Sequence, residues 1–222
     1  MSKKWLLGAS VSAAVFAGGA QANLLSDGSF ESLTLVGGNY GDLLENYGPA
    51  GAVGASWTNG SNSVLAIATT YSENGPLNFV AQSGTNALDL TGVGYEGPVS
   101  LSQTVNLAVG SYLLSFYLGD IKDAGGYALP SAVKVLINNV QQGGTFFNSA
   151  GTLTTNWAQI LVPFTTTGGS TTLTFSTAGL TLDSYTGLDN VVLTAVPEPG
   201  AWLMMLAGMA AVGFVSKRRA AI

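Results

Sequence analysis

Hydrophobic and polar residues alternate along the middle of the chain with a period of two. The alternation is plainest at residues 100–107, 112–118, 133–138 and 172–176. This period is typical of β-strands that bury one face, and no stretch of the body shows a convincing 3.6-residue apolar period. Further strands are expected at residues 63–70, 86–90, 156–164 and 188–195.

Turn residues, mostly Gly and Asn, separate these segments. Many short strands of this kind predict an all-β fold, an antiparallel β-sandwich, in preference to a parallel α/β sheet. The sequences Ala-Val-Gly-Ser at 108–111 and Thr-Gly-Gly-Ser at 167–170 are predicted to be hairpin connections. Within 112–118, the alternation places Phe116 and Leu118 on one face and Tyr117 on the other.

The first 22 residues have the pattern of a secretory signal peptide. Lys3 and Lys4 precede an apolar stretch at 5–16, and Ala20-Gln21-Ala22 places small residues at both positions that determine cleavage. Cleavage after Ala22 would make Asn23 the first mature residue. An uncleaved anchor is disfavoured because the apolar stretch is short.

The last residues, 196–222, combine three features in a fixed order. Pro197, Glu198 and Pro199 come first, an apolar run at 201–215 follows, and Lys217, Arg218 and Arg219 close the segment. Fifteen apolar residues fall short of the roughly 20 that span a bilayer upright, so a short, temporary transmembrane helix is expected. Cations after the run predict a cytoplasmic end, with everything before Pro197 on the outer side of the inner membrane. The functional body is then 23–195, the length of one domain.

This tail resembles the PEP-CTERM sorting signal of Gram-negative bacteria that make extracellular polysaccharide. The resemblance implies that exosortase, a membrane protease, recognises the Pro-Glu-Pro tripeptide and releases or transfers the protein. Glu198 would then be a recognition residue without a catalytic role. The implied destination is the cell surface or the extracellular matrix. The alternative is an ordinary C-terminal anchor that is never cut.

Charge separates the targeting ends from the body. The whole chain carries a formal net charge of −5, whereas the body holds two lysines against eleven acidic residues, a net charge of −9. Such a body should repel nucleic acid and anionic lipid. The chain has no Cys and no His, which excludes disulfides, thiolate metal sites and His-based catalytic triads.

The body also resembles the galactose-binding-like β-sandwich, a jelly roll found in many carbohydrate-binding modules. The residues that carry this resemblance are 23–31, Ser56-Trp57, 86–90, 102–105, 110–112, 114–116 and 188–193. They cover nearly all of the body. The resemblance implies the fold first, and carbohydrate binding less specifically.

In such a sandwich the first and last strands lie side by side, which would bring Glu31 close to Asp189. Two close carboxylates repel each other unless a cation separates them. Calcium accepts carboxylate and carbonyl oxygens at flexible geometry, and similar domains hold a structural calcium at about this place. We therefore predict a calcium site formed by Glu31 and Asp189, with Asp27 as a candidate third ligand. Alternatively, Glu31 faces solvent and Asp189 makes a turn with Asn190.

A sugar-binding site would need exposed aromatic rings and nearby polar side chains. Tyr95 and Tyr127 lie in Gly-rich loops, where binding residues concentrate, and Asp120 and Asp123 could accept hydroxyl hydrogen bonds beside Tyr127. Solvated turns are an equally good reading of these loops. Trp57 and Trp157 are expected to pack in the core, Trp157 in part.

An enzyme is not predicted. Carboxylate pairs for glycoside hydrolysis need a cleft, and the close pairs here lie in turns or at strand ends. No Gly-x-Ser-x-Gly elbow or phosphate-binding loop is present. Two functions stay open: an exported module that binds carbohydrate, such as the cell's own exopolysaccharide, or a structural matrix or surface protein without a dedicated ligand. A concave sheet face lined by two or more exposed aromatics would favour the first, and a flat Ser/Thr face with all aromatics buried would favour the second.

Overall fold

The computed structural model covers the body and very little of the targeting ends. The described residues are 22–33, 44–47, 51–54, 56–61, 64–68, 77–91, 98–122, 127–178, 185–197 and 207–209. The predicted signal peptide except Ala22, the basic residues Lys217, Arg218 and Arg219, and most of the apolar run therefore lie outside the described residues. Within these ranges, no helix has the length and apolar character needed to cross a membrane.

The described body is built from β-strands. They are β1 Leu44–Tyr47, β2 Gly51–Val53, β3 Trp57–Ser61, β4 Val64–Ala68, β5 Asn86–Asp89, β6 Ser100–Asp120, β7 Ser131–Ile137, β8 Val140–Asn148, β9 Asn156–Thr177 and β10 Gly187–Val196. Every ladder between them is antiparallel. The all-β antiparallel prediction is confirmed.

The two long strands β6 and β9 form the centre of the fold. They keep a single register from Ser100 opposite Ser176 to Asp120 opposite Asn156. The two predicted hairpin connections, at 108–111 and 167–170, are therefore wrong. They lie opposite each other inside this ladder, where both strands bend and continue. Gly168 and Gly169 have φ angles of 88° and 94°, which an L side chain rarely adopts, so glycine permits the bend.

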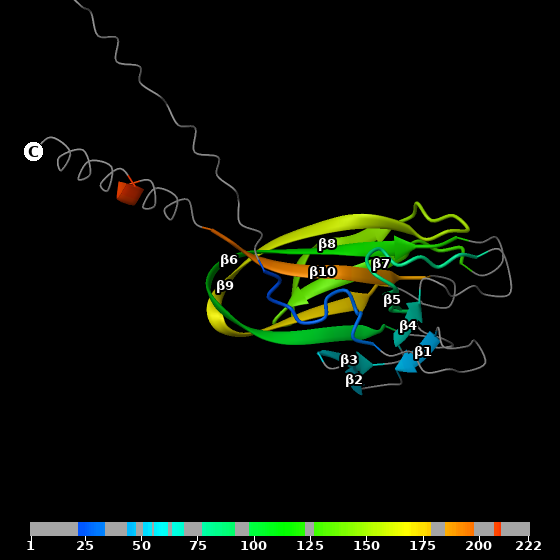
Figure 1. The fold of residues 1–222 in the computed structure, drawn as a ribbon, viewed down its shortest axis with the longest axis horizontal. Coiled ribbons are helices and arrows are strands. Elements are labelled where there is room, and N and C mark those ends of the chain that lie inside the picture. Colours follow the sequence, from blue (N-terminus) through cyan, green and yellow to red (C-terminus); the bar gives the residue numbers. More distant parts are fainter. Residues whose placement is uncertain are drawn as a thin grey trace, which may run out of the picture.

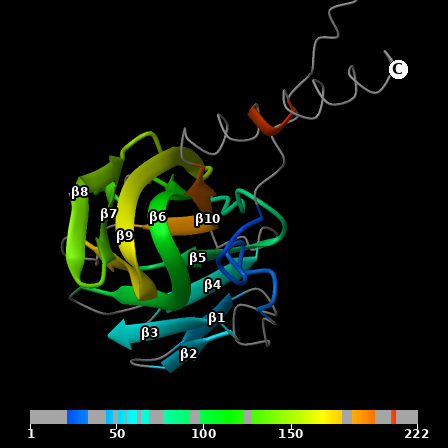
Figure 2. The same cartoon turned by 90° about the vertical axis from the view of Figure 1, so that its left-hand side faces the viewer.

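The bend divides the strands into two layers (Figures 1 and 2). In one layer, the first half of β6 pairs with β3 and with the second half of β9, and β7 and β8 continue the sheet. In the other layer, the second half of β6 pairs with β10 and with the first half of β9. β5, β4 and β1 extend this layer beyond β10.

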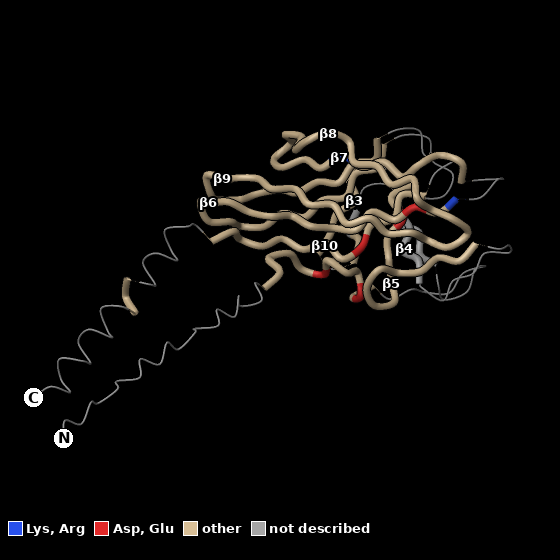
Figure 3. The backbone as a smooth tube through the Cα atoms, turned by 90° about the horizontal axis from the view of Figure 1, so that it is seen from above, with Lys and Arg blue, Asp and Glu red and all other residues tan. Residues whose placement is uncertain are grey.

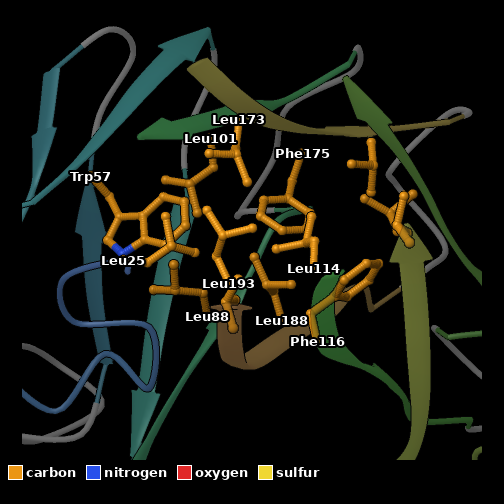
Figure 4. Packing of buried hydrophobic residues seen from close by; sticks show 14 of the residues in the cluster. Leu25, Trp57, Leu88, Leu101, Leu114, Phe116, Leu173, Phe175, Leu188 and Leu193 are labelled. Carbon is orange, nitrogen blue, oxygen red and sulfur yellow. The ribbon is translucent and has the colours of Figure 1, made fainter. Parts of the chain in front are cut away.

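The main core lies between the two layers. Figure 4 shows Leu101, Leu173 and Phe175 from the first layer facing Leu114 and Leu188 from the second. All five side chains are fully buried, and each contributes about 1.5–3 kcal/mol to folding by leaving water. The period-two alternation of apolar and polar residues in these strands thus results from a sandwich in which each sheet buries one face.

Trp57 is part of this core, as predicted from the sequence. It is 1% exposed, and its ring centroid lies 5.6 Å from that of Phe30 and 6.1 Å from that of Phe175. Its indole Nε1 donates a hydrogen bond to the Asp27 carbonyl at 3.0 Å. The residue therefore ties the N-terminal segment to the sandwich.

The N-terminal segment lies along β10, as expected for the first and last parts of this body. Leu24 N donates to the Leu193 carbonyl at 2.9 Å, and Val191 N donates to the Gly28 carbonyl at 2.7 Å. A Cβ atom at position 28 would lie 1.9 Å from the Val191 oxygen. Only glycine permits this close approach of the two backbones.

Candidate functional site

Glu31 and Asp189 both bind the backbone of one short segment, residues 82–86. Glu31 Oε1 accepts hydrogen bonds from the backbone nitrogens of Thr85 and Asn86, at 2.9 and 2.8 Å. Asp189 Oδ2 accepts from Gln82 N and Ser83 N, at 2.8 and 2.9 Å. The predicted proximity of the two carboxylates also has an electrostatic consequence, because the charge of Glu31 contributes to raising the pKa of Asp189.

A third carboxylate, Asp89, is buried in this part of the protein. Burial raises the pKa of Asp89 to about 6, against lowering by hydrogen bonds from Thr91 and Thr186. Burial likewise raises the pKa of Asp189 to about 6. The pKa of the neighbouring Tyr185 hydroxyl lies well above its usual range. Burial is the main cause, and the negative charges of Asp89 and Asp189 add to it.

The predicted calcium ligands are held by hydrogen bonds within the protein. Asp27 binds Ser32, whose backbone nitrogen donates to Oδ1 at 3.1 Å and whose hydroxyl donates to Oδ2. Glu31 and Asp189 face the amides of residues 82–86. In the described part of the chain, no cluster of three or more His, Cys, Asp or Glu is placed to hold a metal ion. A calcium ion at Glu31 and Asp189 would therefore need backbone carbonyls or water as further ligands, and the site stays a prediction.

Asp120 does not have the exposed position expected of a residue that reads sugar hydroxyls. It is 1% exposed. Its Oδ1 accepts hydrogen bonds from Ser131 N and Ser131 Oγ, at 3.1 and 3.0 Å, and its Oδ2 accepts from Gly151 N at 2.8 Å. The Asp120 carboxylate therefore holds the start of β7 and the residues before β9 in position. Its oxygens bind these protein groups and not a ligand.

Tyr127 is half-buried beside a small second apolar cluster. The cluster consists of Leu77, Phe79, Ile121 and Tyr185. The ring of Tyr127 meets that of Phe79 edge-on, with the centroids 6.3 Å apart. Tyr95 and Asp123, the other two predicted sugar-binding residues, lie outside the described residues.

A different pair of aromatics shares the outer face of the second layer. The inward residues of β6 there are buried, whereas on the other face Tyr117 and Trp157 are half-buried and Gln159 is exposed. Tyr117 lies opposite Gln159 in the ladder, and Gly119 lies opposite Trp157. Tyr117 and Trp157 are thus diagonal neighbours on one face, roughly 7–8 Å apart at their backbones. We call Tyr117, Trp157 and Gln159 the outer aromatic face.

Trp157 has a fixed position on this face. Its Nε1 donates to the Val80 carbonyl at 2.8 Å, and its ring lies against the backbone of Gly119. A Cβ atom at Gly119 would come within 2.7 Å of the ring. The expectation that Trp157 packs partly in the core is wrong, because the residue lies on the outer face of the sheet and is half-buried there against Gly119.

The outer face of the first layer has a different character. Its hydroxyl-bearing residues on β3, β6 and β9 include Thr58, Ser102, Thr104, Thr172, Thr174 and Ser176. Thr104 and Thr172 share a hydrogen bond of 2.8 Å between their hydroxyls across the ladder. This is the Ser/Thr sheet face that a hydrated matrix protein would present.

The last strand leads directly into the Pro-Glu-Pro tripeptide. β10 ends at Val196, and Pro197, which follows, is exposed. Glu198 and Pro199 lie outside the described residues. The tripeptide therefore begins as soon as the folded domain ends.

Several solved structures resemble the chain, and carbohydrate-binding modules are prominent among them. TmCBM61 in complex with β-1,4-galactotriose has 17% sequence identity and a TM-score of 0.45, covering 79% of this chain and 99% of that chain. The CBM22-1 xylan-binding domain from Paenibacillus barcinonensis Xyn10C has 17% identity and a TM-score of 0.44, covering 81% and 97%. A family 35 carbohydrate-binding module from Clostridium thermocellum has 14% identity and a TM-score of 0.37, covering 69% and 92%. These values are too low to transfer a ligand.

Comparison with curated protein sequences gives no match. The C-terminal segment, in contrast, matches a defined sorting signal over residues 195–219. This range contains the tripeptide, the apolar run and the three cations. The chain thus carries the PEP-CTERM protein-sorting motif of an exported protein that is sorted to the cell envelope.

Proposed function

We propose that this protein is anchored transiently in the inner membrane, is processed by an exosortase-type enzyme, and binds polysaccharide at the cell surface or in the extracellular matrix. The polysaccharide site is the outer aromatic face. The observation that supports it is the placement of two half-buried aromatic rings and an exposed Gln159 on one face of the sheet. Both rings are half-buried, so part of each ring is open to a ligand on that face.

The chemistry of the outer aromatic face suits a sugar. Aromatic rings offer an apolar surface to the C–H groups of a pyranose, and the Gln159 amide can both donate to and accept from hydroxyl groups. Trp157 is already held by Val80 and Gly119. A preorganised ring loses little conformational entropy when a ligand binds.

The proposal is one of binding without catalysis. Among the described residues, Asp89, Asp120 and Asp189 are buried and accept hydrogen bonds from the protein's own amides. Asp189 lies beside Tyr117 in the ladder and next to Glu31, and both carboxylates are occupied by the amides of residues 82–86. Glycoside hydrolysis needs a pair of carboxylates on either side of the scissile bond.

The alternative function is a structural matrix or surface protein without a dedicated ligand. The Ser/Thr face of the first layer supports it, because those hydroxyls are partly paired with each other and, among the described residues of β3, β6 and β9, no aromatic side chain lies on that face. Under this alternative the outer aromatic face is incidental packing around Gly119.

Binding of the purified protein to a panel of polysaccharides, including the exopolysaccharide of the producing cell, tests the proposal. Saturable binding is expected, with a loss of at least tenfold in affinity in Tyr117→Ala and Gln159→Ala. Phe147→Ala is the matched control, because Phe147 is a 61% exposed aromatic on β8, away from the face. Equal affinity in all three variants would move the site elsewhere, and no binding by the folded protein would favour the structural role.

A further inference from the structure

The first and last described parts of the body leave the domain at the same end. Val196, the last residue of β10, pairs with Ser111, which in turn pairs with Thr165 at the bend of β6 and β9. Leu24 lies beside Leu193, so the N-terminal segment runs along β10 toward the same place. We call this region, residues 107–111 of β6 and 165–169 of β9, the bend end; Figure 1 shows it beside the end of β10.

The bend end is uncharged, and exposed apolar side chains lie at its tip and beside it. Val109 at its tip is 76% exposed, Val196 is 45% exposed and Leu24 is 43% exposed. No Asp, Glu, Lys or Arg occurs in residues 104–116, 160–172 or 191–197. Figure 3 shows the acidic residues of the described chain away from the bend end. The domain therefore has a neutral end and an acidic part.

The sequence ties the bend end closely to the apolar run. Four residues, 197–200, separate the end of β10 from the run at 201–215. Fully extended, the chain from Val196 to Ala201 spans at most about 18 Å. The headgroup layer of a bilayer takes up roughly 5–8 Å of that distance. A folded domain on so short a tether cannot move far from the membrane surface.

We propose that the bend end rests on the outer surface of the inner membrane until the C-terminal segment is processed, with Val109 in contact with the lipid headgroup layer. The inference rests on the proposed membrane anchor. An anionic lipid surface repels the acidic part of the body and not the bend end, so both the tether and the charge favour this orientation. The outer aromatic face and the acidic part then stand free of the membrane, and the tripeptide lies at the membrane surface.

Site-directed fluorescence on the full chain tests this orientation. The protein has no Cys, so a single cysteine can carry a polarity-sensitive dye at Val109→Cys or at Leu153→Cys. Leu153 is the matched control, because it is a 44% exposed apolar residue just before β9, whose first residue Asn156 pairs with Asp120 at the far end of β6. Both proteins are reconstituted into phosphatidylethanolamine/phosphatidylglycerol vesicles that contain a headgroup quencher.

We expect both proteins to float with the vesicles, and the dye at 109 to be quenched at least threefold more than the dye at 153. A ten-residue Gly/Ser spacer after Val196 should reduce the quenching at 109. Flotation with equal quenching at 109 and 153 would overturn the bend-end contact and leave the anchor standing. Failure of both proteins to float would overturn the anchor and, with it, this inference.

Discussion

Glu31 and Asp189 are far apart in the sequence, near the start and the end of the body, but they bind adjacent parts of the same segment, residues 82–86. Glu31 accepts from Thr85 and Asn86, and Asp189 accepts from Gln82 and Ser83. Charge-assisted hydrogen bonds of this kind are worth about 1.5–3 kcal/mol each. The pair therefore joins the N-terminal segment, the residues before β5 and β10 into one unit, with or without a metal ion.

Gly84 should be the most sensitive position of this segment. Its φ angle is +69°, and a Cβ atom there would lie 2.4–2.8 Å from the Glu31 carboxyl group. We expect Gly84→Ala to lower the free energy of unfolding by about 2–4 kcal/mol, from backbone strain and displacement of Glu31. Urea unfolding measures the change.

Gly144→Ala is the matched control, because a Cβ atom at Gly144 would have no neighbour within 4 Å. Its effect should stay within about 1 kcal/mol, the usual Gly-to-Ala range at an open site. If the two variants were equally stable, Glu31 would not hold residues 82–86 as described.

Calcium should raise the melting temperature if Glu31 and Asp189 bind it. The two carboxylates lie close enough for one charge to raise the pKa of the other, and a divalent cation would relieve that repulsion. We expect a higher midpoint in calcium than in chelator, and no difference in Glu31→Gln. An identical midpoint in both buffers for the native sequence would rule the calcium site out.

Two buried carboxylates should make stability depend on pH in an unusual direction. The pKa of Asp89 and that of Asp189 are each about 6 in the folded protein, above the ordinary 3.8. The folded state therefore holds more protons than the unfolded state between about pH 4 and pH 6. The stability that the protonated forms contribute is present below pH 4 and is lost as the pH rises through 6.

Asp89→Asn isolates this effect. The amide oxygen can still accept from the backbone nitrogens of Thr91 and Thr186, but the side chain no longer titrates. The variant should gain stability relative to the native sequence as the pH rises from 4 to 7, by about 3 kcal/mol in total. Urea unfolding at pH 4, 5, 6 and 7 measures this difference, and a difference that stays constant would contradict the raised pKa.

The sequence predicted the strands that bury one face, and it was less informative about how they connect. Alternation located parts of β6, β7 and β9 because each alternates between the core and the outside, and the strand expected at 188–195 corresponds to β10. A Gly-rich stretch has the same pattern whether the chain reverses or bends, which is why the hairpin predicted at 167–170 is wrong. β8 escapes prediction because Gly143 and Gly144 interrupt its pattern where the register with β7 shifts.

The candidate site could be predicted only in part, for reasons of distance along the chain. Asp120 ends a strand and so is expected to be exposed, but its partners Ser131 and Gly151 become visible only in the fold. The position of Tyr117 on the outer face could be predicted, since alternation places it on the side of β6 opposite the buried face. A tyrosine inside a strand is nevertheless a common packing residue, so the pattern alone does not mark it as a binding residue.

The side chain of Asn23, the predicted first mature residue, should stabilise the end of the domain next to the tripeptide. Its Oδ1 accepts from Leu25 N and Leu193 N, at 3.0 and 2.9 Å, and its Nδ2 donates to the Val191 carbonyl at 2.9 Å. Loss of these bonds in Asn23→Ala should cost about 1–3 kcal/mol and speed amide exchange at Leu193. Ser26→Ala is the control, because Ser26 binds Gln103 through its backbone. Equal exchange at Leu193 in both variants would mean that β10 holds its end without Asn23, and that the start of the mature chain does not support the strand that leads into the sorting signal.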